Sequence, residues 1–319
     1  MNTRNLFMAM FAIVAMVLCS CEKVVFEDVA VNNDDLDEGQ VRVTLSIARM
    51  GDGTSFGQTR AVVNAQDYCS TINFVIFQNG KKLTFVNQTA DDEDFGTVSV
   101  TLQAGETYQL LVLAHSCDDN PSLARPSEVE FDNNNTGYTD TFYYYGDLVV
   151  DEDDSNASHE LTLVRATSMF RLVITDDIPE RMNEASFFYT GGSGHFNATT
   201  GYGYTNSKQT KKFAITTERT APQTFEVYTF LKDDEGLLKI SVTFSSDFDT
   251  KTRVFENVPL KRNRITQYSG EFFKDDEDPD NPDNPDNPDN PDTPVNPDSN
   301  SGFSFKMDTE WEGVDEYTF

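Results

Sequence analysis

The chain has 319 residues and a formal charge of -30, because 54 acidic side chains outnumber 24 basic ones. Its length suits about two domains, and its 38% hydrophobic content is enough for folded cores, which excludes a wholly disordered chain. The negative charge argues against nucleic acid as a partner, while 25 Phe and 12 Tyr beside only 3 His and 4 Cys favour β structure and leave few ligands for a zinc site.

The N-terminus has the features of an export signal. Arg4 precedes an apolar run of 13 residues, 6–18, which is too short for a helix that crosses a bilayer. The sequence Leu18-Cys19-Ser20-Cys21 resembles the bacterial lipobox, whose last cysteine receives lipid. We therefore expect residues 1–20 to be a lipoprotein signal peptide and Cys21 to carry the lipid anchor. The alternative is an ordinary signal that the general signal peptidase removes.

An acidic, polar segment follows at residues 21–40, which we interpret as a tether between the lipid and the fold. From Val41 to Ala48 apolar and polar residues alternate, and this period of two predicts a half-buried strand. The strand opens a predicted N-terminal β-sandwich domain at residues 41–164.

Three further strand pairs are predicted in this domain. The first is a hairpin around Asn79-Gly80, a dipeptide that accepts the positive φ angles of a tight turn. The second surrounds Ala104-Gly105, and an acidic loop divides the third. The expected strands are 71–77 with 82–86, 97–102 with 108–115, and 141–150 with 160–164.

A second run of short strands, separated by Gly, Asn, Asp and Pro, predicts a C-terminal β-sandwich domain at residues 165–273. One helical turn is expected at Pro179 to Glu184. The expected strands are 168–175, 185–189, 212–216, 224–231, 237–245, 252–258 and 264–273. The fold class is thus predicted to be all-β, with two tandem β-sandwich domains.

Residues 274–302 are predicted to be a linker, because proline recurs at every third position from Pro279 to Pro297. Three residues make one turn of a polyproline II helix, so the twenty residues 279–298 can extend for about 60 Å at ~3.1 Å per residue. A calcium-binding repeat is the rival interpretation, but evenly spread single carboxylates do not converge on one ion.

Residues 303–319 are expected to hold a C-terminal amphipathic strand, in which Phe303, Phe305, Met307 and Trp311 supply the apolar face. Such a strand must bury that face, either on its own domain or on a neighbouring molecule by strand addition. The sequence leaves both alternatives open.

Two cysteines, Cys69 and Cys117, remain in the folded part of the exported chain. Disulfides persist outside the cytoplasm, so the two can form a bridge. Two inert, buried thiols are the alternative.

Several segments together resemble the fimbrial lipoproteins of Bacteroidota, and in particular the FimB/Mfa-type fimbrial subunits of type V pili. They are the lipobox, Thr59-Arg60-Ala61, and residues 68–77, 141–146, 163–167 and 258–266. The resemblance implies two transthyretin-like β-sandwich domains, export to the outer membrane as a surface-exposed lipoprotein, and contacts with other fimbrial subunits by β-strand complementation.

The resemblance also implies a processing site. In polymerising members of that family, an arginine-specific protease removes the first strand and leaves a groove for a donor strand from the next subunit. The matching position here is Arg60, followed by Ala61. Removal of Val41–Ala48 would leave unpaired backbone groups beside an apolar groove, and an incoming alternating strand would satisfy both. Anchor-type members are not processed in this way, and an arginine in a loop is usually only a solvated charge.

No catalytic motif or cofactor motif emerges. Gly191–His195 approaches a nucleophile elbow but ends in His where Gly is required, so we expect a glycine loop. The acidic runs 91–94, 151–154 and 275–278 are contiguous and are expected to face water. Because no two histidines or cysteines have zinc-finger spacing, the sequence predicts no enzyme, no cofactor and no metal site.

These features predict a structural, non-enzymatic component of a surface fimbria, either its anchor or a subunit, whose host or bacterial surface ligand the sequence does not identify. The alternative is a surface glycan-binding lipoprotein of a polysaccharide-uptake system. Tyr143, Tyr144 and Tyr145 could form a sugar-stacking platform for that alternative, although packing in the core is the default for consecutive strand residues.

Overall fold

The computed structural model of the protein describes residues 26–27, 36–50, 65–131, 137–152, 156–216, 218–274 and 311–319. Within these ranges the chain consists of β-strands and loops, apart from the short 3₁₀ turn η3 (Ala65–Asp67). None of the described residues form a helix that is long and apolar enough to cross a membrane. The predicted all-β class is confirmed. The expected helical turn at Pro179 to Glu184 is wrong. The chain makes a non-helical turn here, closed by the Met182 N–H donating to the Pro179 carbonyl, and Glu184 already begins a strand.

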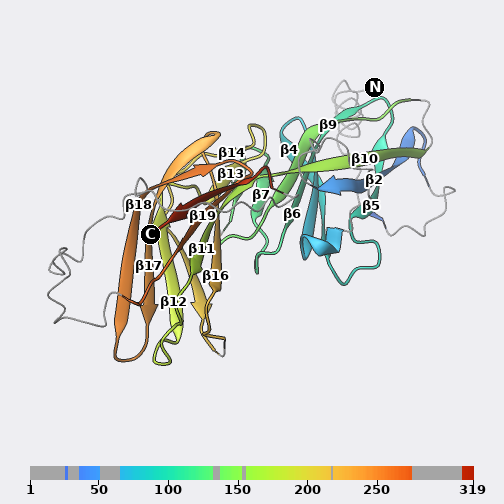
Figure 1. Cartoon of the computed structure of the whole chain (residues 1–319). Coiled ribbons are helices and arrows are strands. Elements are labelled where there is room, and N and C mark those ends of the chain that lie inside the picture. The colour runs from blue at the N-terminus through green and yellow to red at the C-terminus, as the bar shows by residue number, and fades with distance from the viewer. Residues whose placement is uncertain are drawn as a thin grey trace, which may run out of the picture.

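The first half of the chain forms a β-sandwich, seen as the right-hand lobe of Figure 1. Its eight strands are hydrogen-bonded in the order β1-β5-β2-β10-β9-β6-β3-β4. Apolar side chains of β2, β5 and β10 pack against those of β3, β6 and β9 in one core. The strands are β1 (Phe26–Glu27), β2 (Gln40–Met50), β3 (Thr71–Gln78), β4 (Lys81–Thr89), β5 (Thr97–Gln103), β6 (Thr107–His115), β9 (Phe142–Val149) and β10 (Asn156–Arg165).

Of the three predicted strand pairs, only the first is confirmed. β3 and β4 form an antiparallel hairpin around Asn79 and Gly80, which have φ angles of 52° and 73°. The second pair is wrong, because β5 pairs with β2 and β1, whereas β6 pairs with β3 and β9. The third pair is restricted to the strand ends, where Val164 and Arg165 of β10 face β9; most of β10 runs parallel to β2.

The second half of the chain forms another sandwich, the left-hand lobe of Figure 1. Two four-stranded sheets, β16-β11-β19-β20 and β15-β12-β17-β18, enclose a second core that is rich in phenylalanine. The strands are β11 (Thr167–Ile174), β12 (Glu184–Thr190), β15 (Gln209–Ala214), β16 (Gln223–Phe230), β17 (Glu235–Ser245), β18 (Thr250–Lys261), β19 (Ile265–Gly270) and β20 (Val314–Thr318).

A small sheet between the two sandwiches takes strands from both halves of the chain (Figure 1). Its strands are β7 (Ser122–Arg125), β8 (Glu128–Glu130), β13 (His195–Asn197) and β14 (Tyr202–Gly203), and β8 pairs with β13. A third apolar cluster lies here, in which Phe131 and Tyr138 from the first half contact Phe230 from the second. The two sandwiches are therefore joined by a hydrogen-bonded sheet and a buried interface as well as by the chain itself.

Candidate functional site: the docked C-terminal tail and the central strand β2

The strand β20 completes one edge of a sheet in the second sandwich. It runs parallel to β19, with register from Ile265 opposite Val314 to Ser269 opposite Thr318. The backbone hydrogen bonds continue at both ends, where the Ile265 N–H donates to the Gly313 carbonyl at 3.0 Å and the Phe319 N–H donates to Ser269 at 3.2 Å. We call residues Trp311–Phe319 the tail. It is bound as an added strand, the arrangement by which extended peptides bind to a sheet edge.

Aromatic side chains fix the tail to the second core. The Tyr317 ring stacks on Tyr268 with centroids 4.8 Å apart, and the Phe319 ring meets Phe255 edge-on at 5.1 Å. Burial raises the pKa of the Tyr317 hydroxyl above its usual range, with a smaller contribution from the charge of Asp315. At the far end, a Cβ on Gly270 would lie 2.3 Å from the Phe319 carbonyl oxygen, so the absence of a side chain at Gly270 lets the tail approach.

An ion pair binds an acidic residue of the tail to the second sandwich. Arg264, just before β19, donates from Nε and Nη2 to the two carboxylate oxygens of Asp315 at 3.1 and 2.8 Å. Its Nη1 donates to the Glu312 carbonyl at 3.1 Å. The hydrogen bond with Asp315 is the main cause that raises the pKa of Arg264.

Trp311 packs at the junction of the two sandwiches. Its ring lies over the Arg165 guanidinium, with Cζ 3.8 Å from the ring centroid, and only 8% of its surface is exposed. Met169 and Ile265 complete this small apolar cluster. Trp311 therefore anchors the tail at the start of β19.

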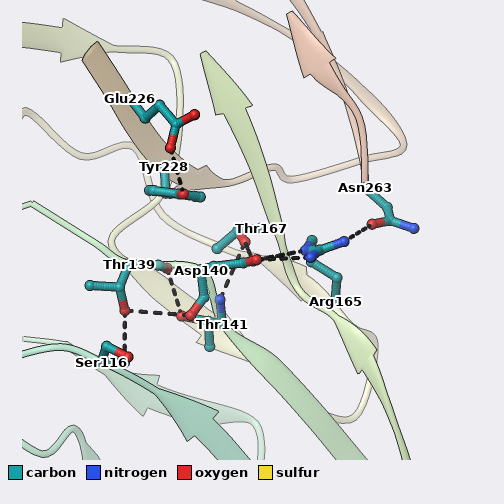
Figure 2. Close-up of polar contacts among 9 residues, drawn as sticks. All are labelled: Ser116, Thr139, Asp140, Thr141, Arg165, Thr167, Glu226, Tyr228 and Asn263. Carbon is teal, nitrogen blue, oxygen red and sulfur yellow. Dashed lines mark hydrogen bonds and ion pairs between the residues drawn. The ribbon is translucent and has the colours of Figure 1, made fainter. Parts of the chain in front are cut away.

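Arg165, the last residue of β10, joins parts of both halves (Figure 2). Its Nε donates to Asp140 at 2.8 Å, and its Nη1 donates to Asn263 at 3.0 Å. Asp140 also accepts from the Thr167 hydroxyl at 3.0 Å. The ring of Phe142 lies 4.6 Å from the guanidinium. A half-open cleft of about 390 Å³ lies beside this group; it is lined by Val164, Arg165, Asp234, Glu235, Lys261, Arg262, Asn263, Arg264 and Glu312.

The predicted first strand occupies the middle of its sheet. β2 pairs antiparallel with β5 on one side and parallel with β10 on the other. The alternation predicted from sequence places every apolar side chain inside, because Val41, Val43, Leu45 and Ile47 are all buried. Loss of β2 would leave a central gap in the sheet above the first core.

Most of the site residues expected from sequence lie outside the described residues, and the roles proposed for them stay predictions. They are Cys21, Arg60, Ala61, Phe303, Phe305 and Met307. Trp311 is described, but it lies in a bend, and the strand begins at Val314. In this structure the strand docks on its own chain.

The two folded cysteines have separate environments. Cys69 and Cys117 are free, buried thiols in this structure. The Cys69 thiol packs in the first core and lies 3.4 Å from the Ala65 carbonyl, and burial raises its pKa to about 12. The Cys117 thiol lies 3.4 Å from the Thr139 hydroxyl.

The three consecutive tyrosines pack on opposite faces of β9. Tyr143 packs against Phe196 and accepts a hydrogen bond from Arg262. Tyr145 packs against the cluster between the sandwiches, and Tyr144 packs against the first core. Among the described residues, no three His, Cys, Asp or Glu side chains come together as metal ligands.

Sequence reasoning missed several residues of this site, namely Asp140, Asn263, Arg264, Asp315, Tyr317 and Phe319. Tyr317 and Phe319, two aromatic residues in an otherwise acidic tail, could have indicated from sequence that the tail packs on the fold. Asp140 had none, because it is one of 54 acidic residues and its partner Arg165 lies on another strand.

A family model described as "Family of unknown function (DUF6562)" matches residues 33–290. This range contains every strand of the two sandwiches except β1 and β20, and it ends before the tail. No curated protein matches the sequence.

Solved structures to which the chain is similar come from Bacteroides, Parabacteroides and Porphyromonas species. A candidate adhesin from Bacteroides ovatus is 12% identical, with a TM-score of 0.46 over 70% of this chain and 84% of that one. A fimbrial assembly protein from Parabacteroides distasonis is 14% identical, with a TM-score of 0.36 over 78% and 92%. The fimbrial anchor protein Mfa2 from Porphyromonas gingivalis is 15% identical, with a TM-score of 0.37 over 64% and 78%. A likeness at this level does not by itself assign a function.

Proposed function

The chain belongs to the DUF6562 family of unknown function, and we propose that it is a structural, non-enzymatic component of a surface fimbria, either its anchor or a subunit. The observation that carries this proposal is the docked tail. At the end of a proline-rich segment, the chain presents a short acidic strand that binds by edge addition to β19. A fold that binds its own strand in this way has the chemistry needed to bind the strand of a neighbour.

The proposed acceptor is the place of β2. If Arg60 is cleaved, β2 is no longer covalently attached to the rest of the fold, and its departure would leave unpaired backbone on β5 and β10 beside the first core. An incoming strand with alternating apolar residues would restore both the hydrogen bonds and the burial. The tail and residues 303–310 of another copy are the proposed donor.

Fractionation of surface fibres tests the proposal. Fibres sheared from cells that express the full chain should contain it in high-mass bands that resist moderate heating in detergent and disappear on boiling. A variant without residues 311–319 should lose these bands if the tail is the donor. A chain that stays monomeric in every fraction contradicts the fimbrial role, and a mobility shift in polysaccharide-containing native gels would support the glycan-binding alternative.

The proposed membrane anchor is lipid on Cys21, after removal of residues 1–20. Growth with a palmitate analogue should label the wild-type protein in the outer membrane and leave Cys21→Ala unlabelled. Equal labelling of both proteins would exclude Cys21 as the lipidated residue.

The intact mass of the surface-extracted protein decides the processing step. A mature chain that begins at Ala61 supports cleavage at Arg60 and a subunit role. A mass that still contains residues 41–60 excludes the cleavage and leaves the anchor role.

A further inference from the structure

We infer that docking of the tail and closure of the junction between the two sandwiches are coupled, with Trp311 as the residue that couples them through Arg165. This inference does not depend on the fimbrial role. It concerns how one end of the chain acts on a contact between its two halves.

The junction is held by Arg165, whose side chain is almost fully buried. The guanidinium forms a two-point contact with Asp140, in which Nε donates to Oδ1 at 2.8 Å and Nη2 donates to Oδ2 at 2.9 Å. Asp140 belongs to the loop that leads into β9, and Arg165 ends β10, so both partners belong to the first sandwich. The pair reaches the second sandwich because Asp140 accepts from the Thr167 hydroxyl of β11 at 3.0 Å and Arg165 Nη1 donates to Asn263 at 3.0 Å. The same loop is tied directly, because the Ala166 N–H donates to the Thr141 carbonyl at 2.8 Å.

Two aromatic rings shield this guanidinium. Phe142 from β9 lies 4.6 Å from Cζ, and Trp311 from the tail lies 3.8 Å from it. Only Trp311 can leave, because Phe142 is a core residue of the first sandwich and Trp311 belongs to the tail. The Asp140 side chain is 22% exposed, so water already reaches one side of the ion pair. Removal of the Trp311 ring would admit water to the guanidinium and weaken its attraction to Asp140, because the attraction between charges falls as the local dielectric constant rises.

A second contact leads to the same junction. Trp311 packs on Tyr228 of β16, with ring centroids 6.4 Å apart. The backbone of Tyr228 forms an isolated bridge with Tyr138, which belongs to the first half of the chain. Trp311 therefore touches two residues, Arg165 and Tyr228, that connect residues 138–141 to the second sandwich.

The coupling is reciprocal by thermodynamic necessity. If the docked tail favours the closed junction, the intact Arg165–Asp140 pair favours the docked tail by the same factor. Arg264 and Tyr317 hold the tail at positions away from this junction, so they act on Asp140 only by changing how often the tail is docked.

Hydrogen exchange on the full chain tests the inference. We expect Trp311→Ala to speed exchange of the Thr141 and Ala166 amides about tenfold, within the usual range of such couplings. Trp311→Phe, which keeps a ring over Arg165, should stay close to wild type. The control Phe188→Ala removes a large, 43% exposed side chain from β12, on the other sheet of the second sandwich, and should leave both amides close to wild type. Wild-type exchange of Thr141 and Ala166 in Trp311→Ala, or an equal effect in Phe188→Ala, would overturn the inference.

The reciprocal measurement uses the fact that Trp311 is the only tryptophan of the chain. Asp140→Asn removes the charge from the junction and leaves the tail sequence intact. In this variant the emission maximum of Trp311 should move to longer wavelength, because the tail spends more time undocked. An unchanged emission spectrum in Asp140→Asn would also overturn the coupling, even if the variant is less stable.

Discussion

Arg264 and Asp315, 51 positions apart in the sequence, meet in a two-bond ion pair with donor–acceptor distances of 3.1 and 2.8 Å. About a quarter to a third of each side chain is exposed, at 27% and 31%. The pair is therefore screened by water in part, and its contribution to docking of the tail should be about 1 kcal/mol.

The first prediction is that Asp315→Asn shifts the tail toward its undocked state about fivefold, which corresponds to ~1 kcal/mol. Emission from Trp311 should move to longer wavelength, and 1 M salt should produce a similar shift in wild type and little further shift in the variant. The control Glu184→Gln breaks the surface pair with Lys212 on the other sheet. If Glu184→Gln shifts the emission as much as Asp315→Asn does, the Arg264 pair has no specific role in docking.

The second prediction concerns Gly270. An added Cβ would lie 2.3 Å from the Phe319 carbonyl oxygen, a distance that the docked tail cannot keep without moving. We expect Gly270→Ala to displace this end of the tail, so that the Phe319 amide, which donates to Ser269, exchanges its hydrogen several times faster than in wild type. Gly236→Ala is the matched control, since its new methyl group would meet only a flexible Leu231 side chain at 3.0 Å. Equal exchange rates of the Phe319 amide in Gly270→Ala and wild type would show that Phe319 is not held there.

The third prediction is a loss of stability in acid that is caused by His115. This side chain is fully buried, and burial lowers its pKa to about 4. Its Nδ1 accepts the Cys117 N–H, so Nε2 carries the proton and donates to the Asn73 amide oxygen at 3.2 Å. An unfolded chain binds a proton on this histidine near pH 6.5, whereas the folded chain does so only near pH 4.

Between these two pH values the unfolded state binds more protons, so the free energy of unfolding decreases as the pH falls. The decrease due to His115 should reach about 3 kcal/mol by pH 4. Urea unfolding of His115→Gln should show lower stability at pH 7 and a flatter pH profile through this window. The control His195→Gln, at a half-buried position, should keep the wild-type slope, and a wild-type slope in His115→Gln would contradict the assignment.

The fourth prediction is that neither folded cysteine reacts in the native protein. Burial raises the pKa of Cys69 to about 12, so almost no thiolate exists at neutral pH, and Cys117 is also buried. Peptide mapping after maleimide treatment should find both residues unlabelled in the native state and labelled in urea. If both stay unlabelled in urea until a reductant is added, the two form a disulfide in the protein tested.

The positions of the strands follow from local sequence, because alternation reports burial on one face. Val41, Val43, Leu45 and Ile47 alternate, and each is buried. Strand partners do not follow in this way. Ala104-Gly105 reads as a hairpin turn, yet the Ala104 N–H bonds to Gly39 and the Gly105 N–H bonds to Val150. The turn therefore passes from one layer of the sandwich to the other. Its partners, Gly39 and Val150, are distant in sequence, so the local pattern could not predict them.

The small shared sheet was beyond sequence reasoning for a similar reason. Its strands have two to four residues, too few to show a period, and the pairing of Phe196 with Val129 joins segments from opposite halves of the chain. For the site, the apolar alternation that ends at Trp311 predicted a docking strand at this end of the chain, but residues 303–310 lie outside the described residues, and the described strand, β20, begins at Val314. Val314, Tyr317 and Phe319 are spaced by three and two residues, which is not the regular period of a strand.

The last prediction is that the two sandwiches unfold together. Phe230, at the end of β16, is fully buried between Phe131, Phe196 and Tyr138, with ring centroids 5.1 to 5.6 Å apart. Because this cluster takes residues from both halves, Phe230→Ala should lower the free energy of unfolding by about 3–5 kcal/mol. The loss should appear equally in Trp311 emission and in the far-ultraviolet circular dichroism of the whole chain. Phe248→Ala, at a position that is 98% exposed, should change neither signal. Two separated transitions in wild type, or a Phe230→Ala effect on only one of the two signals, would mean that the halves unfold independently despite the shared sheet.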